Sequence, residues 1–193
     1  MNMIPFKTEP KADLQFSFPE DLNWEEMDRQ GVKIPTGMTF VDIIIERESD
    51  ILLVEVKDPS NTRTPIAERQ KYLKRLQDNS ILTEELTPKV RDSYTYLHLM
   101  KRDHKPFKYI VLLGLEAFED HTQFALLGNF KNRLLSSVRC EAAEPWRCMH
   151  IADCAVMSVD TWNKTFSDWP VVRLSKSPQD TLPQAQQFPG ATN

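Results

Sequence analysis

Residues 38–61, MTFVDIIIERESDILLVEVKDPSN, hold two apolar runs on either side of a charged turn. Acidic residues interrupt both runs: Asp42 lies in the first, and Glu55 lies in the second, with Lys57 two positions later. Runs this apolar are typical of buried strands, where a charge without compensation costs several kcal/mol. We therefore expect a cation to compensate the two carboxylates, and a divalent metal ion is the expected cation.

The two runs predict a β-hairpin with strands at residues 38–46 and 51–57. Centring the turn between the strands places Asp42 opposite Glu55. Because side chains alternate between the two faces of a strand, Asp42, Glu55 and Lys57 should share one face of the sheet. Directly opposed residues have Cβ atoms about 4.5–5.5 Å apart. The two carboxylates should therefore be close enough to bind one ion.

The composition is typical of a globular domain. The chain has 193 residues, of which 40% are hydrophobic and 27% are charged, so one domain of ordinary size with tails is expected. The formal net charge is −4, whereas a protein that binds nucleic acid strongly by itself usually has a basic face. A cluster of acidic metal ligands would make the chain acidic, and a partner subunit would then supply phosphate contacts.

Cysteine content and hydropathy indicate a cytoplasmic protein. The chain has three cysteines, an odd number that does not suggest a disulfide framework. No apolar run approaches the ~20 residues that a membrane span needs. The N-terminal residues show no signal-peptide pattern. We therefore expect neither export nor contact with a membrane.

Apolar spacing, prolines and glycines predict the other elements. Residues 1–18 are expected to form an extended arm or a short strand. Residues 19–30 are expected to form a helix, because Pro19 suits a first helical turn and Gly31 suits a helix end. Further helices are predicted at 65–78, at 88–103 and in the C-terminal part of 122–139, and strands at 107–116, 153–160 and 171–175.

This order of elements predicts a mixed α/β fold. Strands mixed with helices around a hairpin favour a central mixed sheet with helices on both faces. Residues 176–193 are rich in Pro, Gln, Ser and Thr and are expected to be disordered. The folded domain is therefore expected to span residues 19–175, between an N-terminal arm and a C-terminal tail.

The order Asp42, twelve residues, then Glu55-x-Lys57 resembles the motif of the PD-(D/E)XK nuclease superfamily. The resemblance covers mainly residues 20–116, and Val41 stands where the name of the motif has proline. It implies a restriction-endonuclease-like core, in which a central mixed β-sheet carries the catalytic hairpin between flanking α-helices. It also implies a metal-dependent nuclease.

The resemblance assigns a role to each residue of the motif. Asp42 and Glu55 would bind Mg²⁺, with Mn²⁺ as a substitute, and the Val56 carbonyl would add a backbone ligand. Mg²⁺ prefers oxygen ligands and keeps several waters. A bound metal lowers the pKa of its water and stabilises charge that develops on the phosphate. Lys57 would orient the attacking water and neutralise charge in the transition state.

Members of the superfamily often carry a further acid on the first helix, which is expected here before the hairpin. Glu20, Glu25 and Glu26 are the candidates for this metal ligand, and Glu26 is favoured because it lies close to the hairpin in sequence. A Glu-x-Lys sequence at a strand end can also be solvent-exposed, and Asp42 can also cap a neighbouring backbone group. Two acids on one face of apolar strands favour the metal site over these alternatives.

Basic side chains on the predicted helices are candidate phosphate contacts. The most basic face lies on the helix at 65–78 and consists of Arg69, Lys71, Lys74 and Arg75. Such a face binds phosphates, but an amphipathic surface helix has the same pattern. On the helix at 88–103, Arg91 is the first candidate for contact with nucleic acid or with the catalytic residues, and a solvated helix face is the alternative.

A second cluster consists of cysteine and histidine. Cys140, Cys148, His150 and Cys154 lie within fifteen residues of one another, and both residue types are zinc ligands. The spacing lacks a CxxC pair, and Cys154 lies in an apolar strand pattern. Ordinary buried thiols are therefore expected here, and no zinc site.

The sequence thus predicts a nuclease that hydrolyses phosphodiester bonds in nucleic acid, with DNA expected ahead of RNA. Because the small acidic chain has no separate recognition module, we expect a homodimer or a subunit of a larger DNA-processing or antiviral defence assembly. The alternative is a non-catalytic interaction subunit of a nucleic-acid-associated complex that keeps the nuclease fold. Its docking surface would then include Trp146, Trp162 and Trp169.

Overall fold

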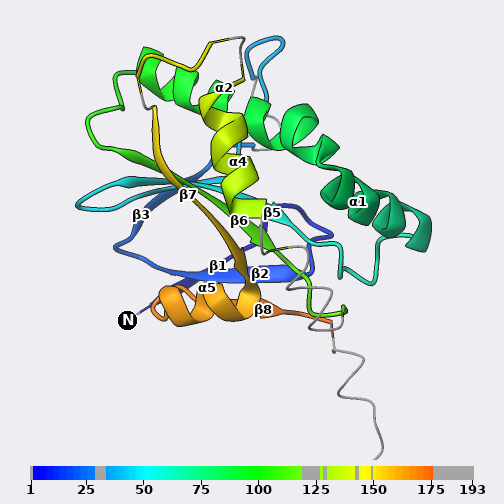
Figure 1. Cartoon of the computed structure of the whole chain (residues 1–193). Helices are drawn as coiled ribbons and strands as arrows, with labels where there is room; N and C mark the ends of the chain where they lie inside the picture. Colours follow the sequence, from blue (N-terminus) through cyan, green and yellow to red (C-terminus); the bar gives the residue numbers. More distant parts are fainter. Residues whose placement is uncertain are drawn as a thin grey trace, which may run out of the picture.

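The computed structural model describes residues 2–28, 34–118, 127, 130–141, 144–148 and 150–175. This part of the chain forms a mixed α/β fold in three layers (Figure 1). Helices form one outer layer, and a five-stranded sheet forms the middle layer. A three-stranded sheet and one helix form the other outer layer.

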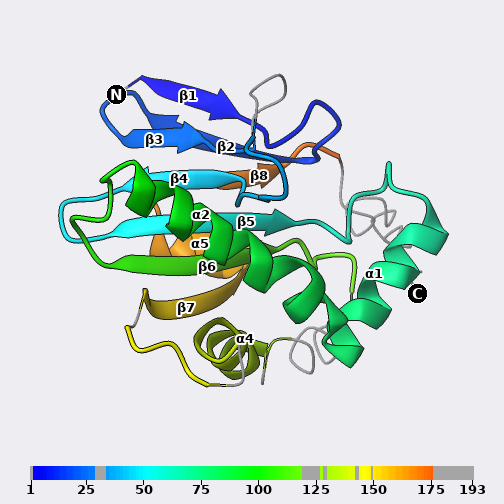
Figure 2. The ribbon, with the colours of Figure 1, turned by 90° about the horizontal axis from the view of Figure 1, so that it is seen from above.

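The middle layer is a mixed sheet with the strand order β3-β4-β5-β6-β7 (Figure 2). Neighbours from β3 to β5 run antiparallel, and neighbours from β5 to β7 run parallel. The strands are β3 (Asn23–Glu26), β4 (Ile43–Glu46), β5 (Ile51–Lys57), β6 (Phe107–Leu113) and β7 (Ile151–Ser158). The predicted hairpin is confirmed as β4 and β5, and the predicted strands at 107–116 and 153–160 are confirmed as β6 and β7.

The smaller sheet has the antiparallel order β1-β2-β8. Its strands are β1 (Met3–Phe6), β2 (Leu14–Pro19) and β8 (Val171–Arg173). The N-terminal segment, for which the sequence leaves an arm or a short strand open, thus supplies two strands. The predicted strand at 171–175 is confirmed as β8. The tail at residues 176–193 lies outside the described part of the chain.

Helices cover the two faces of the five-stranded sheet unequally. On one face lie α1 (Ile66–Asp78), the π-helical turn η1 (Leu82–Leu86), α2 (Thr87–Leu99) and α4 (Phe130–Arg139). The three α-helices lie close to their predicted positions, and η1 was not predicted. The short helix α5 (Val159–Thr165), which the sequence did not predict, packs with the small sheet on the other face. Among the described helices, none is long and apolar enough to cross a bilayer.

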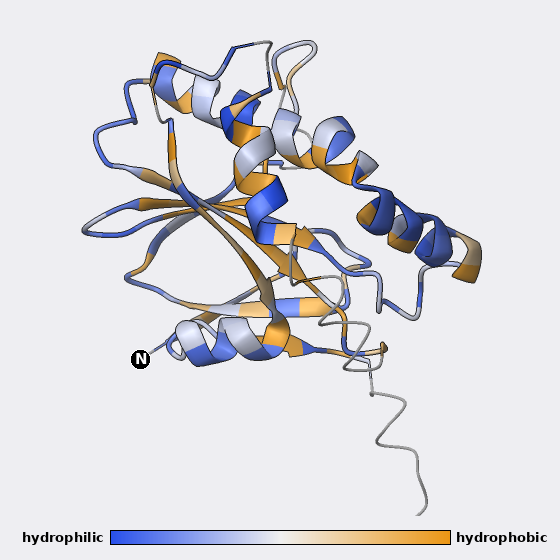
Figure 3. Cartoon of the chain, viewed as in Figure 1, coloured by the Kyte–Doolittle hydropathy of each residue, from blue (hydrophilic) through white to orange (hydrophobic). Residues whose placement is uncertain are grey.

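The alternation of side chains along β5 divides the core into two halves. Ile51 and Leu53 pack against the helices, whereas Leu52 and Val54 pack against the small sheet. Both sets are buried, so β5 is apolar on both faces, as a central strand should be. Figure 3 shows the same division, with apolar residues concentrated on the central strands and a mostly hydrophilic α1. In α1 only Leu76 is buried.

The predicted helix at residues 19–30 is wrong. Pro19 ends β2, and the following residues form β3, in which Trp24 lies opposite Ile45 of β4. The backbone at the edge of the apolar hairpin offers a row of hydrogen-bond partners, and pairing with this edge outweighs the local preference for a helix. Proline suits a helix start, but it also occurs at the edges of sheets. The predicted helix end at Gly31 lies outside the described residues.

Candidate active site

The hairpin brings Asp42 and Glu55 together in the predicted register. Ile43 lies opposite Val54 in the β4–β5 ladder, so Asp42 and Glu55 are the next opposed positions away from the turn. The Val56 N–H donates a 2.6 Å hydrogen bond to Asp42 Oδ2. The first carboxylate is therefore tied directly to the strand that carries the second.

Glu55 and Lys57 lie on the helix-covered face of the sheet, because they continue the alternation of Ile51 and Leu53. The side chain of Glu55 has no exposed surface. Its Oε1 atom forms an ion pair with Lys57 Nζ at 2.6 Å and accepts a 2.8 Å hydrogen bond from Lys89 Nζ. Two ammonium groups thus compensate the negative charge of Glu55, whose burial without compensation would be costly.

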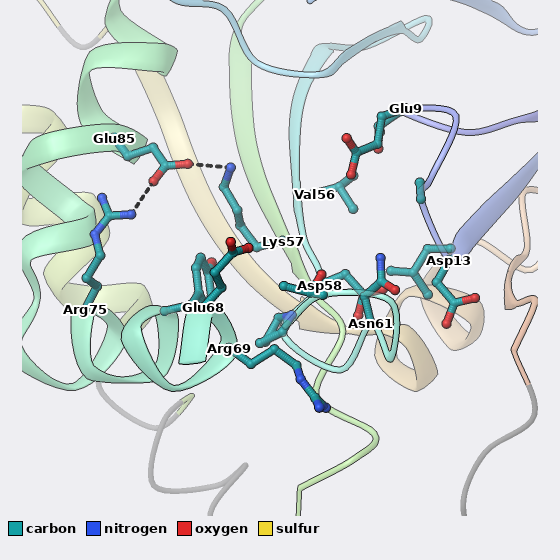
Figure 4. Close-up of a pocket in the computed structure, with 16 residues that line it drawn as sticks. Glu9, Asp13, Val56, Lys57, Asp58, Asn61, Glu68, Arg69, Arg75 and Glu85 are labelled. Atoms are coloured by element: carbon teal, nitrogen blue, oxygen red, sulfur yellow. Dashed lines mark hydrogen bonds and ion pairs between the residues drawn. The ribbon is translucent and has the colours of Figure 1, made fainter. Parts of the chain in front are cut away.

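Lys57 is held by a second acid from the helical layer. Its Nζ lies 2.5 Å from Glu85 Oε1, and Arg75 of α1 donates a 2.9 Å hydrogen bond to Glu85 Oε2 (Figure 4). Burial opposes the charged form of Lys57, but the carboxylates of Glu55 and Glu85 outweigh it and raise the pKa of Lys57 above its ordinary value. The lysine therefore stays an ammonium group at neutral pH.

Lys89, from the first turns of α2, lies among three carboxylates. Its Nζ is 2.8 Å from Glu55 Oε1, 3.8 Å from Asp42 Oδ1 and 3.9 Å from Asp28 Oδ2. The same helix also binds the chain that leads into β4, because Ser93 Oγ accepts a 3.0 Å hydrogen bond from the Val41 N–H. α2 therefore positions both the charges and the backbone of the site.

Asp42 titrates at an unusually high pH. Burial and the nearby charge of Glu55 raise the pKa of Asp42 to about 7, although Lys89, Lys57 and the Val56 N–H oppose this rise. In the metal-free protein Asp42 is thus a mixture of acid and carboxylate near neutral pH. A further positive charge in the site would lower this pKa and favour the carboxylate.

This shifted pKa predicts that Asp42→Asn stabilises the metal-free protein. A raised folded-state pKa means that the folded state holds a proton that the unfolded state has lost, so the free energy of unfolding falls as pH rises from about 4 to about 7. Asparagine keeps an acceptor for the Val56 N–H and carries no charge. Urea denaturation in EDTA should therefore show an advantage for Asp42→Asn that grows over this range and is constant above it. An advantage that does not change with pH would contradict the high pKa.

Two clefts give access to Asp42 and Lys57. The larger has a volume of 730 Å³ and is lined by Asp42 and Lys57, by Glu26 and Asp28 next to β3, and by the loop at residues 7–10. The smaller has a volume of 340 Å³ and lies between the N-terminal segment and α1. Lys57 borders both clefts, and Figure 4 shows it pointing toward Glu85, with Glu9 of the N-terminal loop on the other side of Val56.

The other predicted acids differ in their relation to the site. Glu26 lines the larger cleft together with Asp42. Glu25 instead pairs with Arg102 at 2.5 Å, and Glu20 lies beside Asn2 on the surface. Of the three candidates, the structure places only Glu26 at the cleft.

The predicted basic residues also differ in whether they line a cleft. Arg69 lines the smaller cleft, and Arg75 lines it while paired with Glu85. Lys71 and Lys74 are exposed on α1 and line neither cleft. Arg91 does not reach the hairpin acids, because it pairs with Asp92 and Glu141. On this helix Lys89, not the predicted Arg91, contacts the hairpin acids.

Lys89 and Glu85 were not predicted as site residues, although their helical spacing indicates a shared face. They lie four positions apart in a helical segment, and polar Asp92 and Ser93 follow Lys89 at spacings of three and four. Residues with these spacings share one helix face. This spacing alone could have predicted a polar stripe on α2 that faces the hairpin, and in the structure Asp92 and Ser93 are buried.

The cysteines only partly match their prediction. Cys154 is buried, and burial raises the pKa of its thiol to about 12. Cys140 and Cys148 are exposed, so the prediction of buried thiols is wrong for these two. They lie in the connection between α4 and β7, which contributes little to the core. Trp162 is fully buried beneath the small sheet and belongs to the core, not to a docking surface.

The hairpin acids fit a hard divalent cation. Mg²⁺ is commonly held by one or two carboxylates and several waters, and Asp42 and Glu55 supply two. Within the described residues, Glu55 Oε2 is buried without a hydrogen-bond partner, so this carboxylate has an unused acceptor. No group of three His, Cys, Asp or Glu side chains in the described ranges is arranged to hold a metal as the chain stands.

Arg173 of β8 fastens the loop behind Lys57. It donates hydrogen bonds to Asp13 at 3.0 Å, to both carboxylate oxygens of Asp58 at 3.0 and 2.8 Å, and to Glu116 at 2.6 Å. These acids precede β2, follow β5 and follow β6. Gly114 lies so close that an added Cβ would be 2.2 Å from Asp58 Oδ1. The arginine cluster, Arg173 with its three acids, thus fixes the chain directly after Lys57.

Comparisons of the chain with protein-family models, with curated proteins and with solved structures return no match. A functional assignment therefore rests on the arrangement of Asp42, Glu55, Lys57 and Lys89 itself.

Proposed function

We propose that the protein is a metal-dependent nuclease of the PD-(D/E)XK type, with a restriction-endonuclease-like core. The observation that carries this proposal is the placement of Asp42, Glu55 and Lys57 together on one face of the hairpin, where Asp42 and Lys57 line a 730 Å³ cleft and Glu55 is buried beside Lys57. A buried ion pair often adds no net stability compared with apolar residues of similar size. A catalytic role for Glu55 accounts for a buried carboxylate at this position.

Each residue has a defined part in phosphodiester hydrolysis. Asp42 and Glu55 would hold Mg²⁺ or Mn²⁺, with the Val56 carbonyl as a backbone donor and Glu26, which lines the same cleft as Asp42, as a further candidate. The metal, when bound, lowers the pKa of a water and stabilises charge on the phosphate. Lys57 donates hydrogen bonds to the attacking water or to a phosphate oxygen. Glu85 keeps the Lys57 ammonium group charged and in place.

The charge of the clefts supports an assembly with a partner. The larger cleft is lined by more acids than bases, with Lys7 and Lys57 as its two basic side chains. Arg69 and Arg75 add positive charge to the smaller cleft and are the phosphate contacts that we favour within this chain. We therefore propose that DNA reaches the site as part of a homodimer or a larger DNA-processing or defence complex. The three free thiols support a reducing, cytoplasmic location.

A metal-dependence assay tests the proposed activity. Purified protein is incubated with plasmid DNA, single-stranded DNA and RNA in Mg²⁺, Mn²⁺ or EDTA, beside Asp42→Asn as a variant that keeps the fold. Cleavage should require a divalent ion and should fall at least about 100-fold in the variant, which loses one ligand charge. Cleavage in EDTA, or equal cleavage by Asp42→Asn, would contradict the site. No cleavage under any condition would favour the non-catalytic interaction subunit.

A further inference from the structure

The ammonium group of Lys89 lies where the acids of the site converge. Its Nζ donates a 2.8 Å hydrogen bond to Glu55 Oε1 and is 3.8 Å from Asp42 Oδ1 and 3.9 Å from Asp28 Oδ2. The Lys89 side chain is 14% exposed and Glu55 has no exposed surface. The fold thus places a cation of its own at the meeting point of three carboxylates.

The Glu55 carboxylate retains an unused acceptor in this arrangement. Both ammonium groups that compensate it bind Oε1, while Oε2 is buried with no partner in the described part of the chain. A buried acceptor without a partner is costly, and a lysine that donates to only one oxygen does not remove that cost. A cation that binds the carboxylate through Oε2 or through both oxygens would remove it.

We propose that Lys89 is a built-in competitor for the metal of this site: its ammonium group occupies the metal position, and a divalent ion displaces it. This inference rests on the proposed nuclease function. An ammonium group and a divalent ion repel each other strongly at a separation of a few ångströms, so the acids cannot hold both in the observed geometry. The flexible stem of lysine lets the ammonium group turn away, and Asp28, 49% exposed on the larger cleft, is a partner to which it can turn.

The inference predicts that removing the Lys89 charge tightens metal binding. Mn²⁺ binding is measured by titration calorimetry for wild type, Lys89→Met and Lys89→Gln. The dissociation constant should fall at least about tenfold in both variants. Glutamine retains a hydrogen-bond donor for Glu55 and gives a second variant if Lys89→Met does not fold. Lys164→Met is the matched control, because it removes the same charge from an exposed i,i+4 pair with Asp160, and its affinity should equal that of wild type.

The wild-type protein gives an independent readout of displacement. Acetylation by N-hydroxysuccinimidyl acetate, followed by peptide mass spectrometry, reports how accessible each lysine amine is. Saturating Mn²⁺ should raise the acetylation rate of Lys89 several-fold, because the amine leaves its carboxylate partners, and should leave the rate of Lys164 unchanged. An unchanged or lower rate at Lys89 would overturn the proposal. So would Mn²⁺ affinities in both Lys89 variants that equal or fall below wild type.

Failure of this inference and failure of the proposed function give different results. Mn²⁺ binding that Glu55→Gln abolishes and the Lys89 variants leave unchanged would refute displacement but keep the metal site. If wild type, both Lys89 variants and Glu55→Gln all fail to bind Mn²⁺, the metal site and the nuclease proposal fail together. Binding that appears only in the Lys89 variants would support displacement.

Discussion

Replacing Lys57 with methionine is expected to lower the rate of nucleic-acid cleavage by roughly 10²–10³-fold, the usual cost of removing one hydrogen-bond donor that stabilises a transition state. Lys57 borders both clefts and lies 2.6 Å from Glu55 Oε1. Methionine is close to lysine in length and cannot donate a hydrogen bond. The measurement is a single-turnover cleavage assay at saturating Mg²⁺.

The fold should survive this substitution, because each acid bonded to Lys57 keeps another partner. Glu55 remains bonded to Lys89, and Glu85 remains bonded to Arg75. Mn²⁺ binding to Lys57→Met should therefore persist while the rate falls, which separates a role in the reaction from a role in building the site. Lys164→Met controls for loss of one positive charge. A folded Lys57→Met protein that cleaves at the wild-type rate would exclude Lys57 from the reaction.

Replacing Arg173 with methionine is expected to reduce the free energy of unfolding by roughly 3–5 kcal/mol, the usual cost of removing one partner from a buried ion pair. Arg173 is 12% exposed and is the shared partner of Asp13, which is fully buried, and of Asp58. Without the guanidinium group, both carboxylates would remain in the interior with like charges close together. Urea denaturation at pH 7 would measure the loss.

A surface arginine provides the matched control for this measurement. Arg102 pairs with Glu25, and both side chains are more than one-third exposed. Arg102→Met should therefore cost only about 0.2–1 kcal/mol. If the two substitutions had equal effects, the arginine cluster would contribute no more than an ordinary surface pair.

The hairpin was predictable because two signals in its sequence agree. The apolar runs define two strands, and the short charged turn fixes their register, so Asp42 and Glu55 could be placed opposite each other without further information. The buried β6 could be recognised from its continuous apolar run in the same way. In these segments local preference and tertiary environment favour the same structure.

Elements whose structure depends on distant partners were harder to predict. β3 closely follows Pro19, which suits a helix start, yet it pairs with β4 about twenty positions further along the chain. Lys89 resembles any polar residue near the start of a helix until the parallel connection from β5 to β6 brings α2 over the hairpin. α5 is short, and its burial depends on the small sheet that packs on Trp162. A single sequence shows each partner of these contacts but not their proximity.

The arginine cluster also determines when, during synthesis, the loop after Lys57 can be fixed in place. Asp13, Asp58 and Glu116 leave the ribosome before Arg173, which bonds to acids up to 160 positions earlier in the chain. Domains fold as units once their residues are available, so a nascent chain carries the hairpin acids well before it carries the residue that fixes the loop behind them. In the proposed nuclease the loop behind the hairpin acids is thus fixed only after Arg173 has been made, and a nascent chain that stops short of this residue should lack the rigid site.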